Sequence, residues 1–233
     1  MKLRFSHSLK EADNIYSLFF VPEKPFVFTA GQYIELTIKH DHPDSRGEKR
    51  WFTLSSSPND KELSITTKIT TGSSSFKKAL LNLQAGEEIS MTGPMGDFVL
   101  PKLLQTPLIF VAGGIGITPY NSILRWLSET NEERPIKFIY GVGSEDEIIF
   151  QETFDRLKQH VTIVVEHPSA SWGGERGRLN AELILGLTQP EQNSLIYVSG
   201  PEIMVETLEK DLKKLGIKPG QLVLDFFPNY LSI

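Results

Sequence analysis

The sequence predicts two domains: an antiparallel β-barrel or sandwich over residues 1–102, then an α/β domain with a parallel sheet over residues 103–233. In the first part, alternating stretches such as 32–38 and 63–69 are separated by turn residues, which is typical of antiparallel strands. In the second part, short β-branched runs alternate with amphipathic helical patterns, which indicates a parallel sheet covered on both faces. The pattern changes near residues 100–105.

In the first domain, Ile34, Leu36 and Ile38 should lie on one face of a strand, because strand side chains alternate. A short helix is expected over residues 75–83. Its apolar residues would share a face: Phe76, Leu80 and Leu81.

In the second domain, helices are expected over 119–130 and 201–215, the latter with Pro201 at its start and Gly216 after its end. Strands are expected at five apolar runs: 107–112, 136–140, 161–165, 195–199 and 221–224.

The composition excludes several classes of function. A net charge of −5 argues against nucleic-acid binding, and the absence of cysteine excludes disulfides, thiolate nucleophiles and thiolate-held iron–sulfur clusters. His40-Asp41-His42 matches no metal motif, so no metal site is expected. No signal peptide is visible, and no apolar run approaches the roughly 20 residues of a membrane span. We therefore expect a cytoplasmic protein without a membrane span.

A glycine-rich turn, Gly113-Gly114-Ile115-Gly116-Ile117-Thr118-Pro119, joins an apolar strand to a helix. Glycine allows a tight turn and close approach of a ligand, and the start of a helix suits a pyrophosphate. The alternative is a plain tight turn, since Thr118-Pro119 stands where a G-x-G-x-x-G motif would end. Gly200 and Pro201 repeat the pattern after another strand, where ordinary strand-to-helix geometry is an equal alternative.

A second motif is Arg50-Trp51-Phe52-Thr53, inside a β-rich stretch. Arg50 suits a phosphate, Phe52 presents a flat face to an aromatic ring, and Thr53 offers a hydroxyl. Trp51 should point to the opposite side of the strand from Arg50 and Phe52, so one of the two aromatic rings is expected in the core. Downstream, Gly72-Ser73-Ser74-Ser75 precedes the short helix. It is either a phosphate turn or a serine loop that ends in a helix N-cap.

The order of these pieces resembles the flavin-binding reductases related to ferredoxin–NADP⁺ reductase, over nearly the whole chain. The family pattern is Arg-x-Tyr-Ser/Thr, then Gly-x-x-Ser, then Gly-Gly-x-Gly-Ile-x-Pro. The resemblance implies a flavin on an N-terminal antiparallel barrel and a nicotinamide nucleotide on the C-terminal domain. This chain departs from the pattern in having Phe52 where the family has Tyr, and in not ending on an aromatic residue.

The resemblance also implies roles for single residues. Phe52 would stack on the flavin ring, Thr53 would bond near its N5, and Arg50 with Gly72, Ser73, Ser74 and Ser75 would hold the pyrophosphate. The main chain of Thr66, Thr67 and Lys68 would line the flavin. Residues 113–118 would hold the nicotinamide nucleotide, with Thr118 near the reacting ring. Phe226 or Phe227 would either cover the flavin or belong to the core.

The resemblance favours FAD over FMN, because the Gly72–Ser75 turn is present. The acidic stretch Ser144–Glu147 favours NADH over NADPH, with Arg176 and Arg178 as alternative partners for a 2′-phosphate. The implied reaction passes a hydride from nicotinamide to flavin N5 and then electrons to an acceptor. The acceptor is either a small molecule or a protein such as a ferredoxin, an oxygenase component, a haem protein or a hydrogenase-type complex. Two alternatives remain: a flavin reductase that releases reduced flavin, and a non-catalytic flavin-binding relay or redox-sensing subunit.

Overall fold

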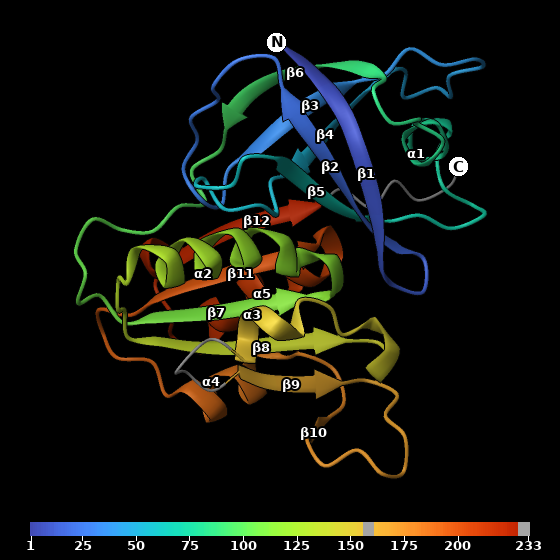
Figure 1. Cartoon of the computed structure of the whole chain (residues 1–233). Helices are drawn as coiled ribbons and strands as arrows, with labels where there is room; N and C mark the ends of the chain where they lie inside the picture. The colour runs from blue at the N-terminus through green and yellow to red at the C-terminus, as the bar shows by residue number, and fades with distance from the viewer. Residues whose placement is uncertain (156–160, 228–233) are drawn as a thin grey trace.

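The computed structural model describes residues 1–155 and 161–227 and contains two six-stranded sheets, one in each half of the chain (Figure 1). The first sheet is antiparallel, in spatial order β4-β3-β6-β1-β2-β5, and a bridge between Leu54 and Ile65 joins its two ends. Its strands are β1 (Lys2–Ala12), β2 (Ile15–Pro22), β3 (Tyr33–Thr37), β4 (Lys49–Thr53), β5 (Leu63–Lys68) and β6 (Glu88–Met95). This closure distinguishes a barrel-like sheet from the sandwich that the sequence left open.

Burial in the barrel follows the expected alternation. Ile34, Leu36 and Ile38 are buried in the barrel core, as predicted. β5 departs from simple alternation, because Ser64 and Thr66 on its polar side are buried as well. Their hydroxyls bond to that of Ser55, each at 2.9 Å. Hydroxyl-to-hydroxyl bonds therefore replace water on this side of the strand.

The helix of the barrel domain is α1 (Ser75–Leu81), two residues shorter than expected. Ser74 is its N-cap, since the Ser74 side chain accepts a hydrogen bond from the Lys77 backbone N–H at 3.3 Å. Phe76 and Leu80 are buried in the barrel core, whereas Leu81 is only partly buried. The burial of Phe76 and Leu80 agrees with the predicted apolar face of this helix, and Leu81 is less buried than these two residues.

The second sheet is parallel, in the order β10-β9-β8-β7-β11-β12. All five predicted strands are present, while the short elements β10, α3 and α4 had not been identified from the sequence. The strands are β7 (Leu108–Gly113), β8 (Ile136–Val142), β9 (Val161–Val165), β10 (Glu175–Arg176), β11 (Leu195–Pro201) and β12 (Leu222–Phe227). The helices are α2 (Thr118–Thr130), α3 (Gln151–Asp155), α4 (Ala181–Thr188) and α5 (Glu202–Lys214), with 3₁₀ turns η1 (Gly114–Ile117), η2 (Glu145–Glu147) and η3 (Pro219–Gln221).

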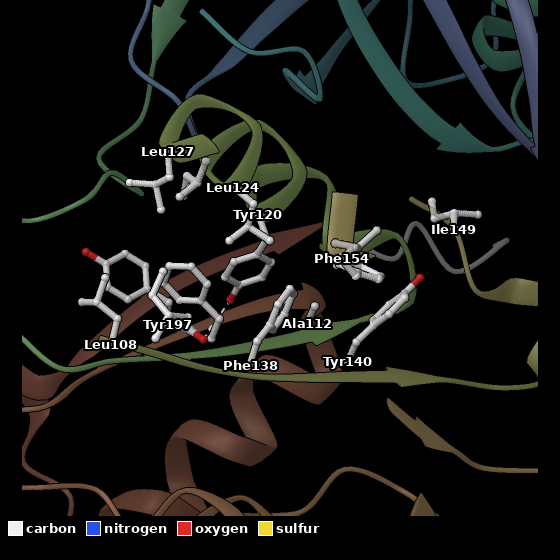
Figure 2. Packing of buried hydrophobic residues seen from close by; sticks show 14 of the residues in the cluster. Leu108, Ala112, Tyr120, Leu124, Leu127, Phe138, Tyr140, Ile149, Phe154 and Tyr197 are labelled. Atoms are coloured by element: carbon white, nitrogen blue, oxygen red, sulfur yellow. Dashed lines mark hydrogen bonds between the residues drawn. The ribbon is translucent and has the colours of Figure 1, made fainter. Parts of the chain in front are cut away.

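Alternate residues of the second sheet enter two separate cores. Phe110 and Phe138 pack with α2 and α3, whereas Val111 and Ile139 pack with α4 and α5. Figure 2 shows Tyr120 reaching from α2 to the sheet, where its hydroxyl lies 3.0 and 2.8 Å from the carbonyl oxygens of Val111 and Tyr197. The sheet is thus covered on both faces, as predicted.

The face with α2 is also the face that meets the barrel. Asn121 donates a hydrogen bond to the Ser55 carbonyl at 2.8 Å, and Ser122 donates one to the Ser56 carbonyl at 2.6 Å. Arg125 pairs with Asp60 at 2.7 Å. We call these contacts between α2 and residues 55–60 the domain seam.

The proposed domain boundary at residues 102–103 falls in the connection between β6 and β7. No helix in residues 1–155 or 161–227 is long and apolar enough to cross a membrane.

Candidate functional site

A cleft of about 650 Å³ lies at the carboxyl ends of the parallel strands. Gly113 of β7, Gly141 of β8, Val164 of β9 and Pro201 of β11 all line it. Ligands of open α/β sheets bind at this edge, outside the carboxyl ends of the strands. The sequence prediction of a binding turn at Gly113 therefore coincides with a real cavity.

The glycines of the predicted turn have different physical roles. A Cβ on Gly113 would collide with the Met204 side chain, and one on Gly116 would collide with the Ser199 carbonyl, so both glycines allow η1 to pack on β11 and α5. Gly114 has a φ of 51° with nothing within 4 Å of an added Cβ. Gly114 is therefore the glycine that keeps the backbone open toward the cleft.

Only part of the predicted turn lines the cleft. Gly113, Gly114 and Ile115 do so, as does Pro201 from the neighbouring strand β11. Gly116, Thr118 and Pro119 are buried. The Thr118 hydroxyl donates to the Ile115 carbonyl at 3.1 Å, which stabilises the start of α2. A catalytic part for Thr118 stays a prediction.

Gly200 is buried between the glycine turn and α5. An added Cβ there would lie 2.5 Å from Met204 Cε and 3.1 Å from the Gly113 carbonyl oxygen. The two strand ends that the sequence singled out are thus in direct contact, and Gly200 is required for their packing.

The barrel domain supplies two lysines to the cleft, Lys68 from the end of β5 and Lys77 from α1. Lys68 pairs with Glu147 at 2.6 Å, and Glu147 also accepts the Gly143 backbone N–H at 3.1 Å. Lys77 donates to the Lys68 carbonyl at 2.9 Å. Burial, followed by nearby guanidinium charges, lowers the pKa of Lys77 to about 8.

At the far side of the cleft, Arg178 pairs with Glu166 at 2.8 Å, and both line the cavity. Arg176 instead donates to carbonyl oxygens of its own loop, including that of Trp172 at 2.6 Å. Of the two arginines that the sequence offered to a 2′-phosphate, Arg178 lies at the cleft and already has a carboxylate partner.

The Arg-aromatic-hydroxyl motif occupies β4 with the expected alternation. Arg50, Phe52 and Thr53 are buried, whereas Trp51 is 60% exposed on the opposite side. Phe52 is therefore the aromatic residue in the core, and its ring stacks on that of Phe76 with 5.9 Å between centroids. Stacking of Phe52 on a ligand ring stays a prediction.

Arg50 is the centre of a compact polar cluster. Its Nη1 donates to the carbonyl oxygens of Arg46 and Lys49 at 2.8 and 2.6 Å, and its Nη2 pairs with Asp44 at 3.0 Å. The other oxygen of Asp44 accepts the Ser75 backbone N–H at 3.2 Å. Arg50 and Ser75, predicted together from distant motifs, thus converge on one anion.

The serine turn has mainly local partners. Ser73 accepts the Thr70 backbone N–H at 2.9 Å, and Ser74 caps α1. Gly72 is exposed. The last residue of the turn, Ser75, contacts Asp44, so the turn is both a helix cap and part of the Arg50 cluster.

On β5, Thr66 and Thr67 are buried and Lys68 is exposed. The barrel ends meet at the Leu54–Ile65 bridge and at the hydrogen bond from Ser55 N–H to the Ser64 carbonyl at 2.8 Å. Beyond these points β4 and β5 form no ladder in the described residues. The backbone of residues 66–68 is therefore paired with β2 on one side and forms no ladder with Arg50–Thr53 on the other.

Phe226 and Phe227 lie on β12, opposite Gly200 and Pro201 of β11. Phe226 is about half exposed. That Phe226 or Phe227 covers a bound flavin stays a prediction. Asn229 and Tyr230 of the same segment lie outside the described residues.

Sequence reasoning missed Lys77, Glu166, Met204 and the glycines at the end of β8. Their signal was weak, because it consisted only of their position after predicted strands and helices. Asp44 carried no signal at all, since it belongs to a polar loop.

Comparison with known proteins agrees with this architecture. A model of the oxidoreductase NAD-binding domain matches residues 110–210. A flavohemoprotein of Xylella fastidiosa is 28% identical over 95% of this chain, and a glycine betaine monooxygenase reductase subunit of Chromohalobacter salexigens is 28% identical over 89%. The chain spans 57% and 59% of the length of these two relatives.

Solved structures have the same two-domain fold. The flavohem-like FAD/NAD-binding domain of nitric oxide dioxygenase from Vibrio cholerae superposes with a TM-score of 0.82 at 22% identity, covering 97% of this chain and 98% of that one. A ferredoxin NADP⁺ reductase from Neisseria gonorrhoeae, with bound FAD and NADP, gives 0.80 at 17% identity with the same coverage. Along nearly its whole length the chain is thus similar to flavohemoprotein and oxygenase reductase sequences, it contains a match to the oxidoreductase NAD-binding domain, and it shares the two-domain fold of ferredoxin–NADP⁺ reductase-like structures.

Proposed function

We propose that the chain is an FAD-dependent NAD(P)H oxidoreductase, with FAD along β4, β5 and α1 and the nicotinamide nucleotide in the cleft. The observation that carries the proposal is the composition of the cleft wall. It contains Gly113–Ile115 of the second domain, and Lys68 and Lys77 of the barrel. The two elements that would hold the flavin, β5 and α1, therefore also border the nucleotide cleft.

The residues present fit the phosphate part of FAD. Arg50 and the Ser75 N–H already bind one carboxylate in common, so their donors converge on an oxyanion. A phosphate oxygen has the same requirement, and charge-assisted bonds of this kind are about twice as strong as neutral ones. The backbone of residues 66–68, which lacks a partner strand in β4, supports the assignment of the ring edge to that segment.

When bound, the flavin supplies the redox chemistry, taking a hydride from nicotinamide at N5 and releasing electrons one or two at a time. The chain orients the two ligands. Thr53, at the end of β4, would donate its hydroxyl near N5, while Gly114 leaves room for the nucleotide. Asn121 and Ser122 hold the domains in register. Because proximity is the main contribution, no acid–base triad is required.

NADH is the proposed donor in preference to NADPH. Glu166 and Glu147 line the cleft, and a carboxylate suits the ribose hydroxyls of NADH but repels a 2′-phosphate. The Glu166 partner, Arg178, is the cation there, and its charge is offset within the pair. The acidic Ser144–Glu147 stretch supports NADH less directly, since Glu145 accepts the Ser169 backbone N–H at 2.8 Å.

The proposed electron acceptor is a protein such as a ferredoxin or an oxygenase component. The support comes from two relatives: the monooxygenase reductase subunit of Chromohalobacter salexigens, and a structure described as the ferredoxin reductase in carbazole 1,9a-dioxygenase, which has a TM-score of 0.79. The support for nucleotide binding, namely the NAD-binding domain match and the cleft, is independent of which acceptor the chain uses.

The test is anaerobic titration of the FAD-loaded chain with NADH and NADPH in parallel, followed through the flavin absorbance bands. We expect NADH to bleach the flavin bands at a lower concentration than NADPH, and the chain to turn over when ferricyanide is added. Arg50→Gln should lose FAD, whereas Lys49→Gln, next to it on the exposed side, should retain it. A chain that stays colourless with FAD contradicts the proposal. Loss of FAD on gel filtration favours a flavin-releasing reductase, and bleaching without turnover favours a relay subunit.

A further inference from the structure

The loop between β3 and β4 places a carboxylate where the flavin phosphate would have to lie. Asp44 Oδ1 accepts a hydrogen bond from Arg50 Nη2 at 3.0 Å, and Asp44 Oδ2 accepts one from the Ser75 backbone N–H at 3.2 Å. These are the same two donors to which the proposed function assigns the phosphate. Arg50 is only 8% exposed, so its guanidinium is held inside this cluster.

Several hydrogen bonds hold the carboxylate in place. Arg46 donates to Asp44 through its backbone N–H at 3.0 Å and through its guanidinium at 3.2 Å. The Asp44 backbone N–H donates to Ser75 Oγ at 3.0 Å, and Ser75 Oγ also bonds to His40 Nε2 at 2.9 Å. Burial alone would raise the pKa of Asp44, but the bonds and charge of Arg46, with the charge of Arg50, hold it at about 2. Asp44 is therefore an anion at neutral pH.

The Ser75 amide has a single hydrogen, so it cannot bond to a phosphate oxygen and to the Asp44 carboxylate at the same time. Two like charges side by side repel each other strongly where water is partly excluded. Binding of a phosphate at the Ser75 amide therefore requires that Asp44 leave this donor, and the repulsion disfavours Asp44 beside Arg50 as well. The hydrogen bonds that Asp44 gives up then offset part of the free energy that the phosphate gains from the same donors.

We propose that Asp44 determines the flavin specificity of the site, by competing with the flavin phosphate for Arg50 and the Ser75 amide. The inference rests on the proposed function, because it concerns the same site. Asp44 lowers the affinity for FAD and FMN, which carry phosphate, and leaves the affinity for riboflavin unchanged. Asp44 thereby reduces the ratio by which the chain prefers FAD and FMN to riboflavin.

The test compares dissociation constants of riboflavin, FMN and FAD, measured by quenching of flavin fluorescence on the full chain. Asp44→Asn should bind FAD and FMN about tenfold more tightly than wild type, a difference of about 1.4 kcal/mol. Riboflavin affinity should stay within about twofold. The matched control is Asp41→Asn, which removes the same charge from an exposed position in the same loop. It should change none of the three constants.

Thermal melting gives a second readout. Asp44→Asn removes a carboxylate from beside the buried Arg50, so the ligand-free variant should melt lower than wild type and gain more from FAD. Asp44→Ala, which likewise removes the carboxylate, is measured alongside in case the asparagine variant does not fold. Unchanged or weaker FAD binding in both folded variants overturns the inference while leaving the proposed function standing. Absence of flavin binding in every chain, wild type included, overturns both.

Discussion

Replacing Asn121 by alanine removes one of the buried hydrogen bonds of the domain seam. Asn121 is 4% exposed, and its amide donates to the Ser55 carbonyl of the barrel while accepting the Thr153 hydroxyl at 2.7 Å. Alanine leaves both groups without this partner. Each unsatisfied buried group costs about 1–3 kcal/mol, and Thr153 is only partly buried. We therefore expect the free energy of unfolding to fall by about 2–3 kcal/mol.

The same substitution should affect the reaction more than the binding of either ligand. FAD and the nucleotide would bind mainly on separate domains, so their dissociation constants should change less than about twofold. Transfer between them depends on how the domains are held, and misplacement of reacting groups is costly. We expect the rate of flavin reduction by saturating NADH to fall about tenfold, measured by stopped-flow absorbance.

The matched control is Thr153→Val, which removes the bond within the second domain and keeps the bond from Asn121 to Ser55. This variant should lose about 1 kcal/mol of stability and reduce its flavin at the wild-type rate. An unchanged rate in Asn121→Ala, or an equal fall in both variants, would refute the view that the seam positions the two ligands.

Three further predictions concern packing, charge and specificity. Gly116→Ala should lower the unfolding free energy by about 3 kcal/mol in urea denaturation, since the new methyl collides with the Ser199 carbonyl; an unchanged midpoint would contradict that packing. The pKa of Lys77 is about 8 in the folded chain and 10.5 in the unfolded chain. Between these two pH values, Lys77 therefore stays protonated mainly in the unfolded state. Stability of the ligand-free chain should therefore rise from pH 8 toward pH 10 and be flatter in Lys77→Met, and identical pH profiles would exclude this assignment. Glu166→Gln, which removes the carboxylate beside Arg178, should raise the ratio of kcat/KM for NADPH to kcat/KM for NADH about tenfold in steady-state assays. The same ratio in the variant and in wild type would contradict this role of Glu166.

Most of the fold could be predicted, because its determinants are local. Strand alternation placed Ile34, Leu36 and Ile38 on one face, and β-branched runs marked the five main strands of the second sheet. The glycine turn could also be predicted from the sequence, because a positive φ at Gly114 and a proline at the start of α2 are local backbone requirements. Helix ends were less accurate: α1 stops at Leu81, because the cap at Asn82 bonds back to Lys78 and Ala79.

The sequence by itself determined the two-domain order, the alternation that places Trp51 opposite Phe52, and the position of the glycine turn at a strand end. The tertiary structure decided which side of β4 is the core, so that Phe52 is buried and Trp51 exposed. It also decided that Lys77 of the barrel helix lines a cleft of the other domain and that Asp44 binds Arg50 and Ser75. Periodicity and turn preference act over a few residues, whereas these contacts depend on how the barrel closes and how the domains meet. Those arrangements arise from the burial of both cores together, and no short stretch of sequence records them.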